Sequence, residues 1–245
     1  MRTIMITGGT RGLGAALTDH FVKTGCNVIM NYRNPDAAER MIEETSASHA
    51  SGQLLAIKAD VRERQAVQEM FAQAITEFGN VDVLINCAGV NRDAVFVDLT
   101  DEDWDTVVDS HLKGTFICSQ EFVKHSTSAS GSIINLGAAC GIQGRLNGAN
   151  FCSAKGGILA LTKCMARELA PDFRINCLTP SAVDTEEVRE RYALDTPAGL
   201  QKVLAGIPMG RLGACADVIH MVESILGAEF TTGENFFVNG GEFMQ

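Results

Sequence analysis

Positive charge and long apolar runs are both scarce in this sequence. Its 245 residues carry 20 Lys and Arg against 30 Asp and Glu, a formal net charge of −10. Proteins bind a phosphate backbone through clustered positive charge, so this balance argues against a nucleic-acid partner. No apolar stretch approaches the roughly 20 residues that a helix needs to cross a bilayer, so we expect no membrane partner. The first apolar run is broken by glycines and is too short for a secretion signal, and we therefore expect a cytoplasmic protein.

The cysteines also lack the spacing of a metal-binding site. None of the eight cysteines belongs to a CxxC pair, the spacing typical of zinc ligands. The cysteines stand inside apolar segments, where a reduced thiol behaves as a small hydrophobic side chain. We therefore expect buried structural thiols and no metal, in preference to a redox or metal-binding role.

The sequence does contain an alternation of short β-branched runs with longer amphipathic segments. Most of the short runs are apolar on both faces, which is typical of parallel strands covered by helices on each side. The expected strands lie at 3–7, 27–31, 54–59, 81–86, 132–136, 174–178 and 235–239. The expected helices lie at 12–24, 35–48, 63–78, 101–125, 151–170 and 215–227. This alternation predicts an α/β fold: a single Rossmann-like, doubly wound parallel sheet of about seven strands with helices on both faces.

No linker, repeat or low-complexity tract divides the chain, so we expect one domain over residues 1–245. The motif "DEDW" follows Thr100, which predicts a helix start with Thr100 as N-cap and Asp103 at the third helical position. The least regular stretch is 180–215. A long insertion at this place in such a sheet is typically a lid over the substrate, so we expect a lid there.

The stretch "TGGTRGLG" at 7–14 directly follows the first expected strand and opens the first expected helix. Gly8, Gly12 and Gly14 would let the backbone approach a pyrophosphate, and the helix N-terminus would present free N–H groups to it. The spacing is TGxxxGxG and departs from the GxGxxG pattern. A turn with spare glycines is the alternative, but the context on both sides favours a dinucleotide site.

Four motifs together resemble one family. They are TGxxxGxG, "NCAG" at 86–89, an aromatic residue four positions before Lys155, and "VNGG" at 238–241. Over essentially its whole length the chain resembles the short-chain dehydrogenase/reductase family. The stretches "NCAGVNRD" and "WDTVVDSHLKGTF" are especially similar to 3-oxoacyl-(acyl carrier protein) and acetoacetyl-CoA reductases.

The resemblance implies a nicotinamide cofactor and assigns positions to it. Asp60 would bond the adenine, Asn86 and Gly89 would flank the cofactor, and Thr185 would touch the carboxamide. The full set of implied cofactor-binding positions is Gly8, Arg11, Gly12, Leu13, Gly14, Arg33, Asp60, Val61, Asn86, Ala88, Gly89, Lys155, Pro180 and Thr185.

The choice between NADP and NAD depends on the end of the second strand. It reads "MNYRN", with no acid at 31–33 to hold a ribose 2′-hydroxyl. Arg11 and Arg33 would suit a 2′-phosphate, so NADP is favoured over NAD. Alternatively, the arginines are solvated surface charges and cofactor binding is lost. The family's Pro-Gly is Pro180-Ser181 here, which we expect to narrow the nicotinamide pocket.

The residues that carry the family's chemistry are mostly absent. The resemblance implies a Tyr that delivers a proton, a Ser that holds the oxyanion, and a relay through Lys and Asn. Phe151 stands at the Tyr position, Ala138 at the Ser and His111 at the Asn, and only Lys155 remains. Loss of a positioned acid costs about 10²–10⁴ in rate, and loss of an oxyanion donor about 10²–10³. We therefore expect no intact catalytic set.

Three interpretations follow. The favoured one is a structural or regulatory subunit of a hetero-oligomeric NAD(P)-dependent hydroxyacyl or ketoacyl thioester oxidoreductase. Its partner in a tetramer would be an active paralogue that holds most of the acyl thioester substrate. Relatives of this kind meet through the helices near 101–125 and 151–170 and through the last strand. The second interpretation is an NADP-dependent enzyme with acid–base chemistry rerouted to His111. The third is a 3-oxoacyl thioester reductase disabled by deliberate substitution at 138 and 151, against which His111 and Ser181 argue.

Overall fold

The computed structural model describes residues 1–47, 51–126 and 130–244, and within them the chain forms one seven-stranded sheet. Every neighbouring pair of strands is parallel, in the order β3-β2-β1-β4-β5-β6-β7. The strands are β1 Thr3–Thr7, β2 Asn27–Tyr32, β3 Leu54–Lys58, β4 Val83–Asn86, β5 Gly131–Leu136, β6 Phe173–Pro180 and β7 Asn235–Val238. The predicted doubly wound parallel sheet is confirmed, and each expected strand is present with its ends shifted by at most two residues.

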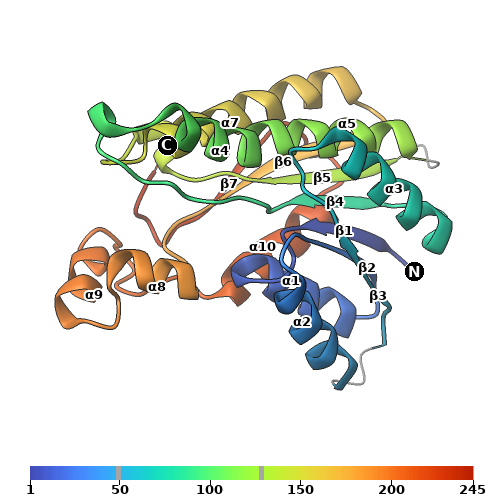
Figure 1. Cartoon of the computed structure of the whole chain (residues 1–245), viewed down its shortest axis with the longest axis horizontal. Helices are drawn as coiled ribbons and strands as arrows, with labels where there is room; N and C mark the ends of the chain where they lie inside the picture. Colours follow the sequence, from blue (N-terminus) through green and yellow to red (C-terminus); the bar gives the residue numbers. More distant parts are fainter. Residues whose placement is uncertain (48–50, 127–129, 245) are drawn as a thin grey trace.

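Helices cover both faces of this sheet (Figure 1). One face packs against α3, α5 and α7 through a cluster that includes Phe71, Phe122 and Ile133. The other packs against α1 and α10 through a cluster that includes Leu17, Phe21 and Val222. The helices are α1 Gly12–Lys23, α2 Pro35–Ala47, α3 Arg64–Phe78, α4 Asp101–Val108, α5 Gly114–His125, α6 Cys140–Gln143, α7 Ala149–Leu169, α8 Glu186–Tyr192, α9 Pro197–Leu204 and α10 Cys215–Gly227. The last position of the helix expected over 35–48 lies outside the described residues.

The helix expected over 101–125 is continuous but not uniform. Between α4 and α5 the segment η2, Asp109–Lys113, is π-helical. The predicted start is confirmed: Thr100 Oγ1 accepts a hydrogen bond from the backbone N–H of Asp103 at 3.1 Å. A π-helical turn widens the helix locally and is frequent at functional sites. Here it contains His111.

The region expected as an irregular lid, 180–215, contains the two short helices α8 and α9. They stand beyond the carboxyl ends of the strands, apart from the sheet (Figure 1). Thr185 and Thr196 cap them, each with a side-chain oxygen that accepts from a backbone N–H. N-cap and proline signals begin these two helices, and the lid over this stretch stays a prediction.

Burial of the cysteines differs from the expectation. Cys118 and Cys177 are buried, five others are partly exposed, and Cys164 is exposed on α7. An exposed Cys164 arises because its position on α7 faces away from the sheet, which the local apolar context does not reveal. Within the described ranges no helix is long and apolar enough to cross a membrane, and no three His, Cys, Asp or Glu side chains gather as metal ligands would.

Candidate functional site

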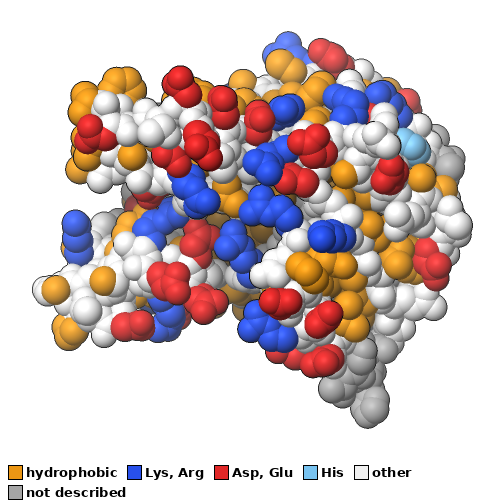
Figure 2. Space-filling view, in the orientation of Figure 1, with side chains coloured by type: hydrophobic (Ala, Val, Ile, Leu, Met, Phe, Trp, Pro, Cys, Tyr) orange, Lys and Arg blue, Asp and Glu red, His pale blue; other side chains and the backbone are white. Residues whose placement is uncertain are grey.

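Two adjoining pockets lie at the carboxyl edge of the sheet. The first, of about 750 Å³, follows the ends of β1, β2 and β4. The second, of about 700 Å³, follows the ends of β5 and β6 and extends under α8 and α9. Gly89, Asn91, Glu187 and Arg191 line both. We call the first the groove and the second the inner pocket. Lys and Arg side chains gather around the hollow between the two halves of the molecule (Figure 2).

The glycine-rich turn forms one wall of the groove, as the sequence predicts. Gly8 has φ +65° and Gly12 has φ +52°, a backbone conformation that favours glycine. A Cβ on Gly8 would lie 2.8 Å from Ala88 Cα, so the turn packs directly on the end of β4. A Cβ on Gly14 would lie 2.2 Å from the Gly8 carbonyl oxygen. Only glycine at these positions lets the turn close and bring the N-terminus of α1 to the groove.

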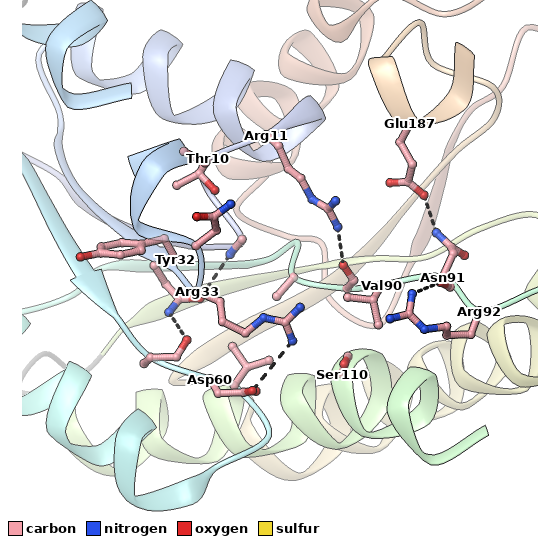
Figure 3. Close-up of a pocket in the computed structure, with 18 of the residues that line it drawn as sticks. Thr10, Arg11, Tyr32, Arg33, Asp60, Val90, Asn91, Arg92, Ser110 and Glu187 are labelled. Atoms are coloured by element: carbon pink, nitrogen blue, oxygen red, sulfur yellow. Dashed lines mark hydrogen bonds and ion pairs between the residues drawn. The ribbon is translucent and has the colours of Figure 1, made fainter. Parts of the chain in front are cut away.

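Arg33 and Asp60 face each other in the groove (Figure 3), 3.9 Å apart. The Asp60 carboxylate is mainly held by Arg62, whose side chain donates at 2.7–3.1 Å. The Arg62 hydrogen bond holds the pKa of Asp60 below its usual value. Arg33 is more than half exposed, so its guanidinium is accessible to a ligand. The sequence predicted Arg33 and Asp60 but missed Arg62, although the spacing "DVR" was a usable signal.

Arg11 crosses the groove from the start of α1. Its Nη2 donates to the carbonyl oxygen of Gly89 at 3.1 Å (Figure 3). Opposite, the Asn91 amide contacts the Glu187 carboxylate of α8, which joins the expected lid to the loop after β4. Both bridges involve residues that line the two pockets, because Gly89, Asn91 and Glu187 belong to each lining.

Four predicted cofactor residues do not line either pocket. Asn86 is buried, and its amide donates to Ser119 Oγ at 3.1 Å and Asn135 Oδ1 at 2.9 Å. Thr185 caps α8 through Val188 N at 3.4 Å. Gly12 and Gly14 shape the turn by their backbone alone. The remaining predicted cofactor residues, brought together at the two pockets, are Gly8, Arg11, Leu13, Arg33, Asp60, Val61, Ala88, Gly89, Lys155 and Pro180.

The inner pocket brings together the four positions implied for catalysis: His111, Ala138, Phe151 and Lys155. Phe151 is at the centre of this set. The His111 ring meets it edge-on with 5.0 Å between centroids, and Lys155 Nζ lies 5.5 Å from its centroid. Lys155 is 7% exposed and donates to the Leu136 carbonyl at 2.5 Å. Burial lowers the pKa of Lys155.

His111 is a buried, neutral imidazole. Its Nε2 lies 2.9 Å from the Val90 carbonyl oxygen, an acceptor, so Nε2 carries the hydrogen. Burial, together with the charge of Lys155, lowers the pKa of His111 to about 3. Its Nδ1 is buried without a hydrogen-bond partner among the described residues, and such an acceptor costs about 1–3 kcal/mol.

Arg145 is a part of the inner pocket that the sequence did not predict. Its guanidinium makes two hydrogen bonds to Asp93, at 2.7 and 2.8 Å, and lies 5.2 Å from the Phe151 ring centroid. Arg191 of α8 approaches the same Asp93 at 3.9 Å. Ser181, which stands where the family pattern has a glycine after the proline, hydrogen-bonds through its Oγ to the Glu242 carboxylate at the pocket. These partners lie far apart in the chain, so no local pattern reveals them.

The seven-stranded parallel sheet and the glycine turn at its carboxyl edge define a Rossmann-like α/β protein. Residues 2–194 match the family described as short chain dehydrogenase, and the chain therefore belongs to the short-chain dehydrogenase/reductase family of oxidoreductases.

Similar proteins match over the full chain. "3-oxoacyl-[acyl-carrier-protein] reductase FabG" of Staphylococcus epidermidis is 34% identical over 248 aligned residues, covering 99% of each chain. "Short-chain reductase protein NovJ" of Streptomyces niveus is 34% identical, covering 97% of this chain and 92% of the relative. The solved structure of a mutant short-chain dehydrogenase/reductase from Serratia marcescens superposes with a TM-score of 0.89 at 28% identity, covering 98% of this chain and 97% of that one.

Proposed function

We propose that the groove binds NADP(H) and that the isolated chain is catalytically impaired. The glycine turn, the exposed cation of Arg33 and the absence of an acid at 31–33 fit a dinucleotide with a 2′-phosphate. Arg33 would hold that phosphate, the α1 N-terminus the pyrophosphate and Lys155 the nicotinamide ribose. When bound, the nicotinamide supplies hydride chemistry. The residues of this chain can bind and orient such a cofactor.

One observation carries the proposal of impairment. Phe151 and Ala138 line the inner pocket at the implied acid and oxyanion positions, and neither has a hydroxyl. Reduction of a ketone near neutral pH needs a proton donor and a donor to the developing oxyanion. The Arg145 guanidinium does not replace them, because it is held by Asp93.

Rerouted chemistry at His111 is less well supported. A general acid must carry a proton to give, and the pKa of His111 is lowered to about 3 by burial and by Lys155. At neutral pH the ring is uncharged, and its one N–H is directed at Val90. Cys140 also borders the pocket, but burial and the neighbouring Cys152 thiol raise its pKa to about 12, which disfavours a thiolate nucleophile.

The role that fits an impaired chain is a structural or regulatory subunit beside an active paralogue, which would bind most of a hydroxyacyl or ketoacyl thioester. The thioester class rests on relatives named 3-oxoacyl-[acyl-carrier-protein] reductase. Two features favour assembly. Helices α4 and α5 expose Trp104 (37%) and Phe116 (40%), and β7 stands at an edge of the sheet. A partner that binds only the folded state stabilises it.

The test is isolation of the native protein followed by light scattering with its suspected paralogue. We expect a mixed tetramer, with activity only when the paralogue is present. Phe116→Glu should reduce mixed assembly, whereas Ile42→Glu on α2, at a matched exposure of 40%, should not. A stable homotetramer that excludes a fully active paralogue would disprove the subunit role.

A further inference from the structure

The thiols of Cys140 and Cys152 contact each other beside the inner pocket. Cys140 is the first residue of α6, and Cys152 lies in the first turn of α7. A hydrogen bond joins the two side chains, and both cysteines are free thiols. Two free thiols in direct contact are the reactants from which oxidation makes a disulfide bond.

Two glycines hold α6 directly against α7. A Cβ on Gly141 would lie 2.7 Å from the backbone nitrogen of Gly156, and a Cβ on Gly156 would lie 2.9 Å from the carbonyl oxygen of Gly141. The two backbones therefore touch with no side chain between them. Cys140 directly precedes Gly141, and Cys152 lies one turn before Gly156 on the same side of α7. The contact between the thiols follows from this packing of the backbone.

Both thiols can be reached from solvent. Each of the two cysteines is partly exposed, whereas Cys118 and Cys177 are buried. Cys140 also lines the inner pocket, whose volume is about 700 Å³. Hydrogen peroxide is little larger than water, so the pocket admits it to the pair.

The order in which the two sulfurs react follows from their surroundings. Oxidation of a cysteine by a peroxide begins at the thiolate, and burial raises the pKa of Cys140 to about 12. Cys140 is therefore disfavoured as the first sulfur to be oxidised. This assigns the first step to Cys152 and leaves Cys140 to complete the bond.

We propose that Cys140 and Cys152 form a reversible disulfide when the protein meets hydrogen peroxide. The Cys152 thiol is first oxidised to a sulfenic acid, as the O–O bond of the peroxide breaks and one water leaves. The Cys140 sulfur then attacks the sulfenic sulfur, the S–S bond forms, and the sulfenic oxygen leaves with the Cys140 proton as a second water. The two sulfurs together lose two electrons, which reduce one peroxide to two waters. A dithiol such as dithiothreitol returns the two electrons and restores both thiols.

The bond closes a loop over residues 140–152, and this loop contains Arg145. The Arg145 guanidinium pairs with Asp93 and lies over the Phe151 ring in the inner pocket. A cross-link between the ends of a loop restricts the conformations of the chain between them. Oxidation therefore stiffens one wall of the inner pocket. This effect depends neither on cofactor binding nor on assembly with a paralogue.

The test is peptide mapping of the full chain after treatment with hydrogen peroxide and alkylation of the remaining thiols. Trypsin cleaves after Arg145 and separates the two cysteines into the peptides 125–145 and 146–155, with one cysteine each. We expect a joined peptide that is two hydrogens lighter than the sum of the two, absent before oxidation and after dithiothreitol. The oxidised protein should also unfold at a temperature roughly 5–10 °C higher than the reduced protein at the same concentration.

Three serine variants assign the role of each sulfur. Cys140→Ser should give no joined peptide and should leave a sulfenic acid at Cys152, which dimedone labels. Cys152→Ser should also give no joined peptide, and dimedone should not label Cys140. The matched control is Cys164→Ser, which changes an exposed cysteine of the same helix α7 and should still give the joined peptide.

The wild-type protein decides the outcome without any variant. A joined peptide that dithiothreitol separates supports the disulfide. If peroxide oxidises the exposed Cys164 completely while the peptides 125–145 and 146–155 stay separate, the disulfide is overturned. It is also overturned if either peptide is joined to a different cysteine instead. None of these results bears on whether the groove binds NADP(H), so the two proposals fail separately.

Discussion

Replacing Gly89 with alanine should destabilise the chain through His111 alone. The new Cβ would lie 1.9 Å from His111 Cε1, 2.5 Å from Nδ1 and 2.6 Å from Nε2. Unbonded carbon atoms pack about 3.5–4.0 Å apart, so the ring would have to move by roughly 1.5–2 Å. The backbone of Gly89 is not in the left-handed region, so the substitution adds no conformational strain. The whole cost arises from the displaced ring.

The size of this cost follows from what holds the ring. Overpacking of a buried site costs about 1–3 kcal/mol, and loss of the Nε2 hydrogen bond to Val90 adds about 1 kcal/mol. We expect Gly89→Ala to lower the free energy of unfolding by about 2–4 kcal/mol. Urea unfolding at fixed protein concentration measures this as a lower midpoint with an unchanged slope.

A double-mutant cycle with His111→Ala isolates the contact. With the ring removed, Gly89→Ala should cost less than about 1 kcal/mol, because little remains for the Cβ to meet. The matched control is Gly227→Ala, where a Cβ would meet nothing within 4 Å and which should be neutral or slightly stabilising. If Gly89→Ala costs the same with and without the ring, or no more than Gly227→Ala, then His111 does not lie over Gly89.

Three further predictions concern activity, cofactor choice and acid stability. Phe151→Tyr combined with Ala138→Ser should give measurable ketone reduction with NADPH, whereas we expect none from the wild type; an inactive double variant that still binds the cofactor would show that the pocket lacks more than two hydroxyls. Arg33→Gln should weaken NADPH about tenfold in fluorescence titration and leave NADH unchanged, because one charge-assisted contact to the 2′-phosphate is lost; equal effects on both cofactors would contradict this. The pKa of His111 falls from near 6.5 in the unfolded chain to about 3 in the folded protein. Below pH 6.5 the unfolded state therefore binds more protons than the folded state, and the free energy of unfolding decreases as the pH falls. At pH 5 this decrease is about 2 kcal/mol. His111→Asn should remove this loss in denaturant unfolding at pH 7 and pH 5, and His220→Asn should retain it, whereas equal acid sensitivity in both variants would argue against a buried, neutral His111.

The parts of the fold that local patterns control were predictable. Runs that are apolar on both faces indicated most of the seven strands, because strands covered on both sides bury mainly apolar side chains. The glycine turn was readable because Gly8 and Gly14 allow close backbone approaches that other residues forbid. The cap at Thr100 was readable because its hydroxyl serves a backbone N–H three residues on.

The parts that depend on distant residues were not predictable. The π-helical turn around His111 leaves no mark in the hydrophobic period, since the extra residue is absorbed within a long helix. Arg145 meets Asp93 across 52 positions, and Asn86 meets Asn135 across 49. Asn86 was expected to flank the cofactor, but a buried amide must find partners, and these lie beneath the groove. Helix α9 was not predicted although its signal is local, because Thr196 followed by a proline is typical of a helix start.

The phenylalanine at residue 151 also determines how the buried Lys155 ammonium is stabilised. A buried ammonium is costly unless it has partners. Lys155 has two: it donates a hydrogen bond to the Leu136 carbonyl and lies over the face of the Phe151 ring. A desolvated cation over an aromatic face gains about 2 kcal/mol, which offsets part of that cost. Removing the ring at residue 151 would therefore leave the Lys155 ammonium with fewer contacts and a larger uncompensated desolvation cost.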